Sequence, residues 1–234
     1  MDKKLTYVLV HGSGLGGWCW SKVKQLMETH GVTVFTPTIS ETSLTLDSSI
    51  EEIVKLIEFE RLQNCVLVGH SYGGMIITGV ADRLKKRIKR VIFLDAAVPN
   101  DGDDFASHIP GITEEHAEKR RQAFQSFSRD GKWIEPIAPE LAGIHTRDNI
   151  DYVNKNARPH SLQSWLEPIK FENDGIKCVL KTYILATDPP TDMMGYPVHG
   201  AIAKKSDDWT YREVHCGHAA MIIRPEEITN LILE

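Results

Sequence analysis

Several features that stabilise or localise other classes of protein are scarce in this chain. Its 234 residues include only four cysteines, and none of them forms a CxxC or CxxH pattern. No apolar run approaches the ~18 residues that a membrane span needs. No block of basic residues stands out against the net charge of -5. We therefore expect no disulfide framework, no metal site, no membrane span and no nucleic-acid partner.

The amino terminus also lacks room for a targeting segment. Met1-Asp2-Lys3-Lys4 leads within a few residues into an apolar run, so we expect no signal peptide. Together with the absence of a disulfide framework, this favours a cytoplasmic protein. A chain of this length suits one large domain or a domain with a lid.

Apolar runs that are typical of buried strands alternate with segments of helical spacing. We predict strands at 7–11, 32–36, 65–68 and 91–95, and helices at 20–30, at 73–86 and from a capping box at 48–51. Alternating strands and helices imply right-handed crossovers and a mostly parallel sheet. The fold class is therefore α/β.

This alternation stops between about residues 99 and 175. The segment is polar with scattered aromatic residues, which fits either a set of surface helices or a cap over an active site. We favour a small, mainly helical cap at 100–175, inserted into a core formed by 1–99 and 176–234. Strand patterns return at 181–186 and 211–214, and a helical pattern closes the chain at 225–233.

A segment bounded by glycines carries the clearest chemical signal. It reads Gly69-His70-Ser71-Tyr72-Gly73, which fits the G-x-S-x-G pattern of a nucleophile elbow. It follows an apolar strand pattern and precedes a helical one, and its glycines permit the tight turn. We therefore predict that Ser71 is a nucleophile at the carboxyl edge of the sheet.

The general base that a serine needs is expected late in the chain. A serine hydroxyl is a weak nucleophile without a base, and in chains with this elbow the base is a histidine after a late strand. His215 and His218 both qualify. His218 lies beyond the strand and before the last helix, whereas His215 lies closer to the strand, so we favour His218.

Backbone amides are expected to stabilise the negative charge of a tetrahedral intermediate. One is the amide of Tyr72, next to the nucleophile. The other is expected from Ser13, in the glycine-rich loop at 11–17 that follows the first strand. This loop lacks the Gly-Lys-Ser/Thr ending of a phosphate-binding loop and the acid that would follow a dinucleotide fingerprint. We therefore expect no nucleotide and no other cofactor.

At this point the chain resembles the α/β-hydrolase superfamily over nearly its full length. More narrowly, it resembles the branch of plant methylesterases, salicylate-binding protein, hydroxynitrile lyases and small bacterial esterases. The matching stretches are VLVHGSGLGGWCW at 8–20, GHSYGG at 69–74, FLDAAVP at 93–99, and 217–218 with Met221. The resemblance implies a mostly parallel sheet flanked by helices, a catalytic triad in the order serine, acid, histidine, and no cofactor.

The acid of the triad is the part that matches least well. The usual acid follows the strand at 181–186, where the expected position falls on Pro189. Asp188 lies one residue earlier and Asp192 three residues later. A second acid position is known in the superfamily, after the strand that follows the nucleophile helix, and Asp95 stands there. A carboxylate at the end of a buried strand is costly unless paired, so we favour Asp95 and keep Asp188 open.

The branch that the chain resembles includes both ester hydrolysis and cyanohydrin cleavage. Its lyases use a threonine in the first loop and a lysine after the catalytic histidine. This chain has Gly12 and Ala219 at these positions, so we predict hydrolysis of a small carboxylic ester. Other activities remain open: slow turnover in a ligand-binding or signalling protein on this scaffold, a lactonase, or a haloperoxidase-like enzyme.

The substrate pocket is expected to be apolar. Trp165 lies in the cap segment among other aromatic residues, and Gly12 lies in the loop that must approach the substrate. We expect a small-molecule ester as the partner, no membrane partner, and either a monomer or a homodimer.

Overall fold

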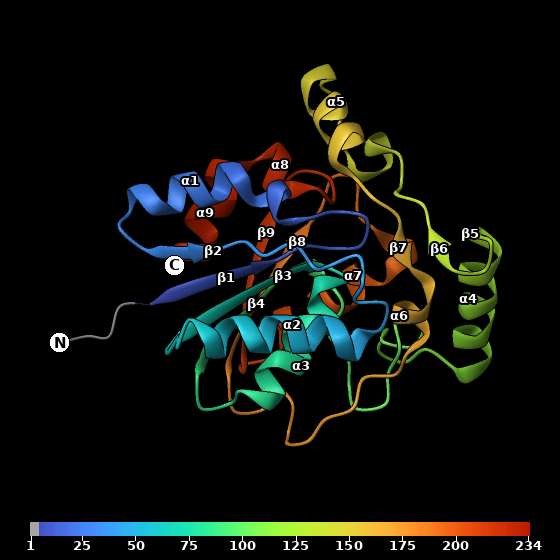
Figure 1. The fold of residues 1–234 in the computed structure, drawn as a ribbon, viewed down its shortest axis with the longest axis horizontal. Helices are drawn as coiled ribbons and strands as arrows, with labels where there is room; N and C mark the ends of the chain where they lie inside the picture. The colour runs from blue at the N-terminus through green and yellow to red at the C-terminus, as the bar shows by residue number, and fades with distance from the viewer. Residues whose placement is uncertain (1–4) are drawn as a thin grey trace.

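A parallel sheet of six strands forms the centre of the protein in the computed structural model, which describes residues 5–234 (Figure 1). Its order is β2-β1-β3-β4-β8-β9, and every neighbouring pair is parallel. The strands are β2 (Thr33–Phe35), β1 (Thr6–Val10), β3 (Cys65–Ser71), β4 (Ile88–Ala96), β8 (Leu180–Ala186) and β9 (Trp209–Val214). The predicted α/β fold class is therefore confirmed.

Helices cover both faces of this sheet (Figure 1). On one face lie α1 (Ser21–Thr29), α8 (Ala220–Ile223) and α9 (Pro225–Leu233), and on the other lie α2 (Leu46–Phe59), α3 (Gly73–Arg83) and α7 (Tyr196–Lys205). Since both faces are buried, the inner strands β1, β3 and β4 contain continuous apolar runs, as the sequence indicated. No helix within residues 5–234 is long and apolar enough to cross a membrane.

An apolar layer lies on each face of the sheet, and successive residues of a strand point alternately into one layer and the other. In β1, Val8 and Val10 pack with α2 and α3, whereas Tyr7 and Leu9 pack with α1 and α9. This follows from the alternation of side chains across a strand. Since each layer is closed by helices, the carboxyl ends of the strands are left as the edge on which a site can form.

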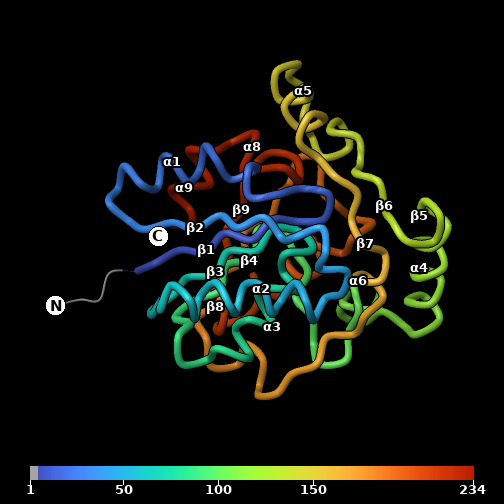
Figure 2. The backbone as a smooth tube through the Cα atoms, viewed as in Figure 1, coloured from blue at the N-terminus to red at the C-terminus, as the bar shows by residue number. Residues whose placement is uncertain are grey.

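A second layer of short elements follows β4 and lies beyond the carboxyl ends of the central strands (Figure 2). Its strands form a separate antiparallel sheet of three, so none of them extends the central sheet. The elements are α4 (Glu114–Phe127), β5 (Ser128–Arg129), β6 (Trp133–Ile134), the 3-10 helix η2 (Pro139–Ala142), α5 (Arg147–Asn156), β7 (His160–Ser161) and α6 (Leu162–Leu166). The mainly helical cap is thus present, while its bounds at 100–175 stay a prediction.

Two details of the predicted helices were wrong. The helix expected from a capping box at 48–51 begins at Leu46, because Thr45 is the N-cap and exchanges hydrogen bonds with Ser48. Helix α7 was not predicted at all. It follows Gly195, whose φ of 74° ends the 3-10 helix η3 (Asp192–Met194) in the left-handed region.

Candidate active site

The turn between β3 and α3 holds Ser71 in a left-handed backbone conformation with φ of 57°. A β-carbon on Gly69 would come within 2.7 Å of the carbonyl oxygen of Gly73. One on Gly73 would come within 2.8 Å of the carbonyl oxygens of Val10 and His11. The glycines are therefore required by close backbone approach, and the strained turn presents Ser71 at the cavity described below.

His218 is joined to the carboxylate of Asp95 in the interior. Its Nδ1 lies 2.6 Å from Asp95 Oδ2, and the Asp95 side chain is completely buried. Asp95 lies near the end of β4, beside the strand that carries Ser71, and its φ is 43°. Because a carboxylate only accepts, His218 Nδ1 donates this hydrogen bond, and its Nε2 is left as the nitrogen that can accept a proton.

The other two acid candidates do not contact His218. Asp188 is largely exposed, and its Oδ2 lies 3.3 Å from Nε2 of His215, which is also exposed. Asp192 is exposed in η3. The loop between them still reaches the site, because Thr191 donates from Oγ1 to Asp95 Oδ2 over 3.0 Å. The structure thus brings His218 together with Asp95 and separates it from Asp188, which was the open alternative.

Tyr196, the first residue of α7, connects the serine to the histidine. Its hydroxyl lies 3.1 Å from Ser71 Oγ, and its ring stacks on that of His218 at 5.3 Å between centroids. Within residues 5–234, Ser71 Oγ forms a hydrogen bond with Tyr196 and none directly with His218. Burial raises the pKa of Tyr196, so its hydroxyl stays protonated and able to donate.

The loop after β1 approaches the serine from the other side. The amides of Ser13 and Tyr72 donate none of the loop or side-chain hydrogen bonds found in the described part of the chain, residues 5–234. Both are therefore free to act on a bound ligand. A β-carbon on Gly12 would come within 2.8 Å of Ser71 Cβ. Gly12 thus lies behind the serine, and it is not among the residues that line the cavity within residues 5–234.

Two buried histidines fix the backbone around this site. His11 donates from Nδ1 to the carbonyl of Gly12 over 2.8 Å and accepts from the amide of Ile39 over 3.0 Å. His70 donates from Nε2 to the carbonyl oxygen of His218 over 3.0 Å. Burial lowers the pKa of both rings, so both stay neutral. The loop after β1, which carries Ser13, and the loop of His218 are therefore each held by a neutral imidazole.

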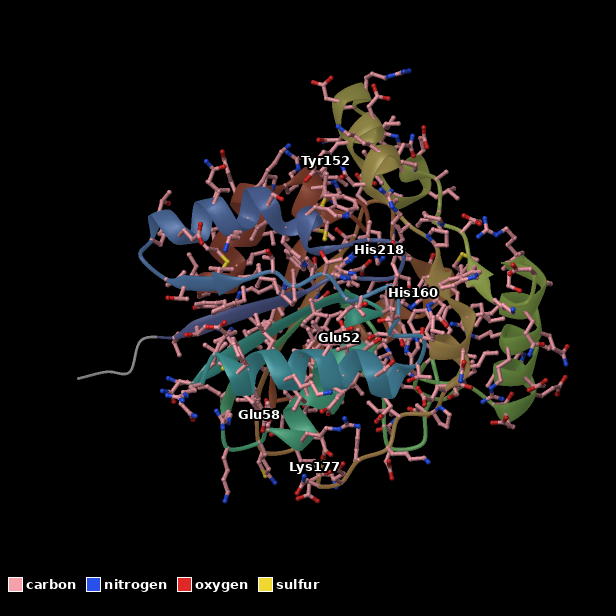
Figure 3. All side chains as sticks on the ribbon, in the orientation of Figure 1. Glu52, Glu58, Tyr152, His160, Lys177 and His218 are labelled. Carbon is pink, nitrogen blue, oxygen red and sulfur yellow. The ribbon has the colours of Figure 1, made fainter. Side chains whose placement is uncertain are left out.

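Ser71 and His218 open into one cavity of about 420 Å³, at the boundary between the core and the cap, where Figure 3 labels His218 and His160. Its wall is mostly apolar and includes Trp165 and Ala219. Trp165 donates from its indole nitrogen to Ser13 Oγ over 2.7 Å. Within residues 5–234, no cluster of three or more His, Cys, Asp or Glu side chains could hold a metal ion.

This geometry can be compared with known proteins. Residues 7–231 match the model of the Alpha/beta hydrolase family. The chain belongs to this family.

Two curated relatives of this hydrolase are named as esterases. The carbendazim hydrolyzing esterase of Nocardioides sp. (strain SG-4G) is 32% identical over 234 residues, covering 95% of this chain and 96% of the relative. Methylesterase 17 of Arabidopsis thaliana is 30% identical over 122 residues, covering 46% of this chain and 44% of the relative.

Solved structures share the fold of this hydrolase. An extracellular α/β-hydrolase from a Paenibacillus species superimposes with a TM-score of 0.80, at 23% identity and with 98% of each chain covered. Tomato methylketone synthase I superimposes with a TM-score of 0.76, at 17% identity, covering 99% of this chain and 97% of that one.

Some residues of the hydrolase site were not found from the sequence. Tyr196 lies 125 positions from Ser71, and no local pattern marks it. His160 lies in a segment read only as part of the cap, although it lines the cavity. His11 and His70 lie inside the predicted motifs, but their hydrogen bonds were not predicted. His11 bonds to the carbonyl of the next residue, Gly12, and His70 bonds to the carbonyl of His218, 148 positions away.

Proposed function

We propose that this α/β hydrolase is a serine esterase that cleaves a small carboxylic ester through an acyl-enzyme. The observation that carries the proposal is the bond between His218 Nδ1 and Asp95 Oδ2 at 2.6 Å, with Ser71 on the same cavity. This arrangement supplies a nucleophile, a base and an acid that orients the base. The esterase names of the two curated relatives agree with it.

In the proposed mechanism Ser71 Oγ attacks the ester carbonyl while His218 Nε2 takes its proton. Asp95 keeps the proton of His218 on Nδ1 and stabilises the imidazolium that forms. The amides of Ser13 and Tyr72 donate to the developing oxyanion. The imidazolium then protonates the leaving alcohol. Water activated by the same histidine afterwards cleaves the acyl-enzyme and releases the carboxylic acid.

Ser71 Oγ must approach His218 during this cycle. In the free protein its hydrogen-bond partner is Tyr196, so binding of the ester has to direct the Ser71 proton to His218. Such hydrogen bonds commonly tighten only in the substrate complex. Because Tyr196 can donate, its hydroxyl remains a partner for Oγ after the proton has left.

Two positions argue against cyanohydrin cleavage as the second activity of this site. Ala219 follows His218 and carries no charge that could favour a departing cyanide. Gly12 carries no hydroxyl, and a β-carbon there would press on Ser71. We therefore expect no detectable release of cyanide from mandelonitrile.

The test is turnover of p-nitrophenyl esters of increasing acyl length, with Ser71→Ala as the control. We expect hydrolysis, a loss of more than ~10³-fold in kcat for the variant, and stoichiometric labelling of Ser71 by a serine-directed phosphonate. Full activity of the alanine variant, or labelling at another residue, would contradict the proposal. Efficient release of cyanide would contradict the choice of reaction.

A further inference from the structure

His160 is a polar residue in a cavity wall that is otherwise mostly apolar. It begins β7 in the cap, and its side chain lines the same cavity as Ser71. Most of the other lining residues are apolar, among them Leu15, Phe105, Ile134 and Trp165. A hydrogen-bonding atom here is a means of selecting among apolar ligands.

The proton of His160 can be placed on one nitrogen from its neighbours. Ser164 Oγ lies 2.8 Å from the carbonyl oxygen of Ser161, which only accepts, so the Ser164 hydroxyl proton is used there. His160 Nε2 lies 2.8 Å from the same Oγ and must therefore donate to it. Burial lowers the pKa of His160 to about 3, so at neutral pH the ring carries one proton, on Nε2.

The other ring nitrogen, Nδ1, is then an acceptor without a partner. No hydrogen bond to Nδ1 occurs within residues 5–234. Nor is Nδ1 among the buried side-chain atoms that lack a partner in this part of the chain, so it reaches open space. Because the ring lines the cavity, this lone pair is available to a ligand.

The acceptor is also held in place. The His160 ring packs against Tyr72 at 4.9 Å between centroids, edge to face. Tyr72 is fixed in turn, because its hydroxyl donates to the carbonyl oxygen of Ser164 over 2.9 Å. The backbone of His160 pairs with Ile134 of β6. A rigid acceptor loses little entropy when it binds a donor, which favours selectivity.

Two further features of the cavity around His160 are a hydrogen-bond donor and the absence of cationic side chains. Ser13 lines the cavity, and its Oγ accepts from Trp165, so within residues 5–234 its own proton has no acceptor. No Lys or Arg side chain lines the cavity within residues 5–234, so a charged carboxylate would find no opposite charge there. Glu135 and Asp192 also line the cavity, so the site disfavours an anionic ligand.

We propose that His160 Nδ1 accepts a hydrogen bond from an N–H or O–H group on the apolar, ring-bearing part of the substrate. The preferred substrates are then esters without a negative charge, in which an aromatic or similar ring system carries such a donor. Esters that lack the donor, or carry it methylated, leave Nδ1 buried without a partner and bind more weakly. This assignment of a substrate class rests on the proposed esterase function.

The test uses binding, so that it does not depend on turnover. Indole and indene have nearly the same shape, and 1-methylindole adds one methyl group at the nitrogen, but only indole has an N–H. Their affinities are measured by calorimetry with the full-length Ser71→Ala protein. We expect indole to bind about tenfold more tightly than the other two, as a single hydrogen bond would give. In Ser71→Ala/His160→Phe, the three affinities should agree within about twofold.

Two further variants separate this role from a structural one. Ser164→Ala removes the partner that keeps the His160 proton on Nε2, so the preference for indole should shrink while the ring remains. His215→Phe changes an exposed histidine outside the cavity and should keep the full preference.

Equal affinities for indole and 1-methylindole, a preference that survives His160→Phe, or no binding of any of the three would each overturn the subsite. None of these results would affect the esterase proposal, which is decided by labelling and turnover at Ser71.

Discussion

At the scale of single residues, Asp95 is held in a conformation that is unfavourable by itself. Its φ of 43° lies in the left-handed region, which costs about 1–3 kcal/mol for a residue other than glycine. Its Oδ1 is buried and has no hydrogen-bond partner within residues 5–234, which costs a similar amount. Such costs concentrate at functional sites, because there the surrounding structure imposes them.

Removing the charge of Asp95 therefore tests its role directly. Asp95→Asn cannot hold the proton of His218 on Nδ1 or stabilise an imidazolium, so we expect kcat to fall about 10³–10⁴-fold. The matched variant Asp188→Asn changes an exposed carboxylate whose ion pair, within residues 5–234, is with His215, and it should keep kcat within about twofold. Circular dichroism and thermal unfolding establish that both variants fold. A larger loss in Asp188→Asn would exclude Asp95 as the acid.

Tyr196 is expected to position the nucleophile. Tyr196→Phe removes the hydroxyl next to Ser71 Oγ but keeps the ring that stacks on His218. We expect kcat/KM and the rate of phosphonate labelling to fall about fivefold, corresponding to ~1 kcal/mol for one hydrogen bond. Tyr211→Phe, on the outer strand β9, should change neither rate. Unchanged labelling in Tyr196→Phe would show that the hydroxyl does not assist Ser71.

Local motifs predicted only the part of the site that is local in sequence. Ser71 stands in a five-residue pattern whose chemistry depends on its immediate neighbours, and His218 in the loop before the last helix. The contact that distinguishes Asp95 from Asp188 spans 123 positions. It depends on how far two loops reach over the edge of the sheet, and no spacing in the sequence encodes that distance.

At the scale of elements, α3 lies close to its neighbours because of two glycines. A β-carbon on Gly74 would overlap the carbonyl oxygen of Ala97, which belongs to the backbone after β4. One on Gly79 would overlap Cδ1 and Cγ1 of the Ile50 side chain of α2, and no backbone atom. A backbone carbonyl cannot move without shifting its strand, whereas a side chain can turn away.

The two glycines should therefore respond differently to alanine. We expect Gly74→Ala to lower the free energy of unfolding by about 2–3 kcal/mol, as overpacking does. For Gly79→Ala we expect a change within about 1 kcal/mol, because alanine favours the helix by a similar amount. Urea denaturation measures both. Equal effects would show that the α3 backbone can move away from β4.

The elements that the sequence predicted well are those with one dominant signal. The central strands are buried on both faces, so their apolar runs are continuous and easily recognised. Helix α7 was missed because it contains Pro197 and Gly200 and follows a 3-10 turn, so its helical spacing is weak. A β-carbon on Gly200 would come within 3.0 Å of Leu185 Cδ2 in β8, which is a tertiary reason for a residue that disfavours helices.

At the scale of the whole molecule, the interior contains several histidines that burial keeps neutral. His108 and His199 form one such pair, with His108 Nδ1 lying 2.9 Å from His199 Nε2. Burial lowers the pKa of both, and that of His199 to about 4. The ring of His108 stacks on that of Tyr196, so the cap, α7 and the active site meet around this pair. Protonation of this pair would place charge inside the apolar layer.

The stability of the fold should therefore decrease in acid. A histidine whose pKa is lower in the folded chain stabilises it fully above the unfolded pKa of about 6.5. This contribution is lost as the pH falls from there toward the folded pKa, near 4 for His199. For His199 alone the loss at pH 5 is about 2 kcal/mol. We expect the free energy of unfolding to fall by at least this amount between pH 7.5 and pH 5.0.

A double variant identifies the source of this acid sensitivity. His108→Phe/His199→Phe replaces both rings, so neither is left without its partner, and it should show a loss between pH 7.5 and pH 5.0 that is smaller by about 2 kcal/mol or more. His215→Phe changes an exposed histidine and should show the same loss as the unaltered protein. Urea titrations at the two pH values measure the difference. If the double variant loses as much stability between the two pH values as the unaltered protein, groups other than His108 and His199 cause the acid sensitivity.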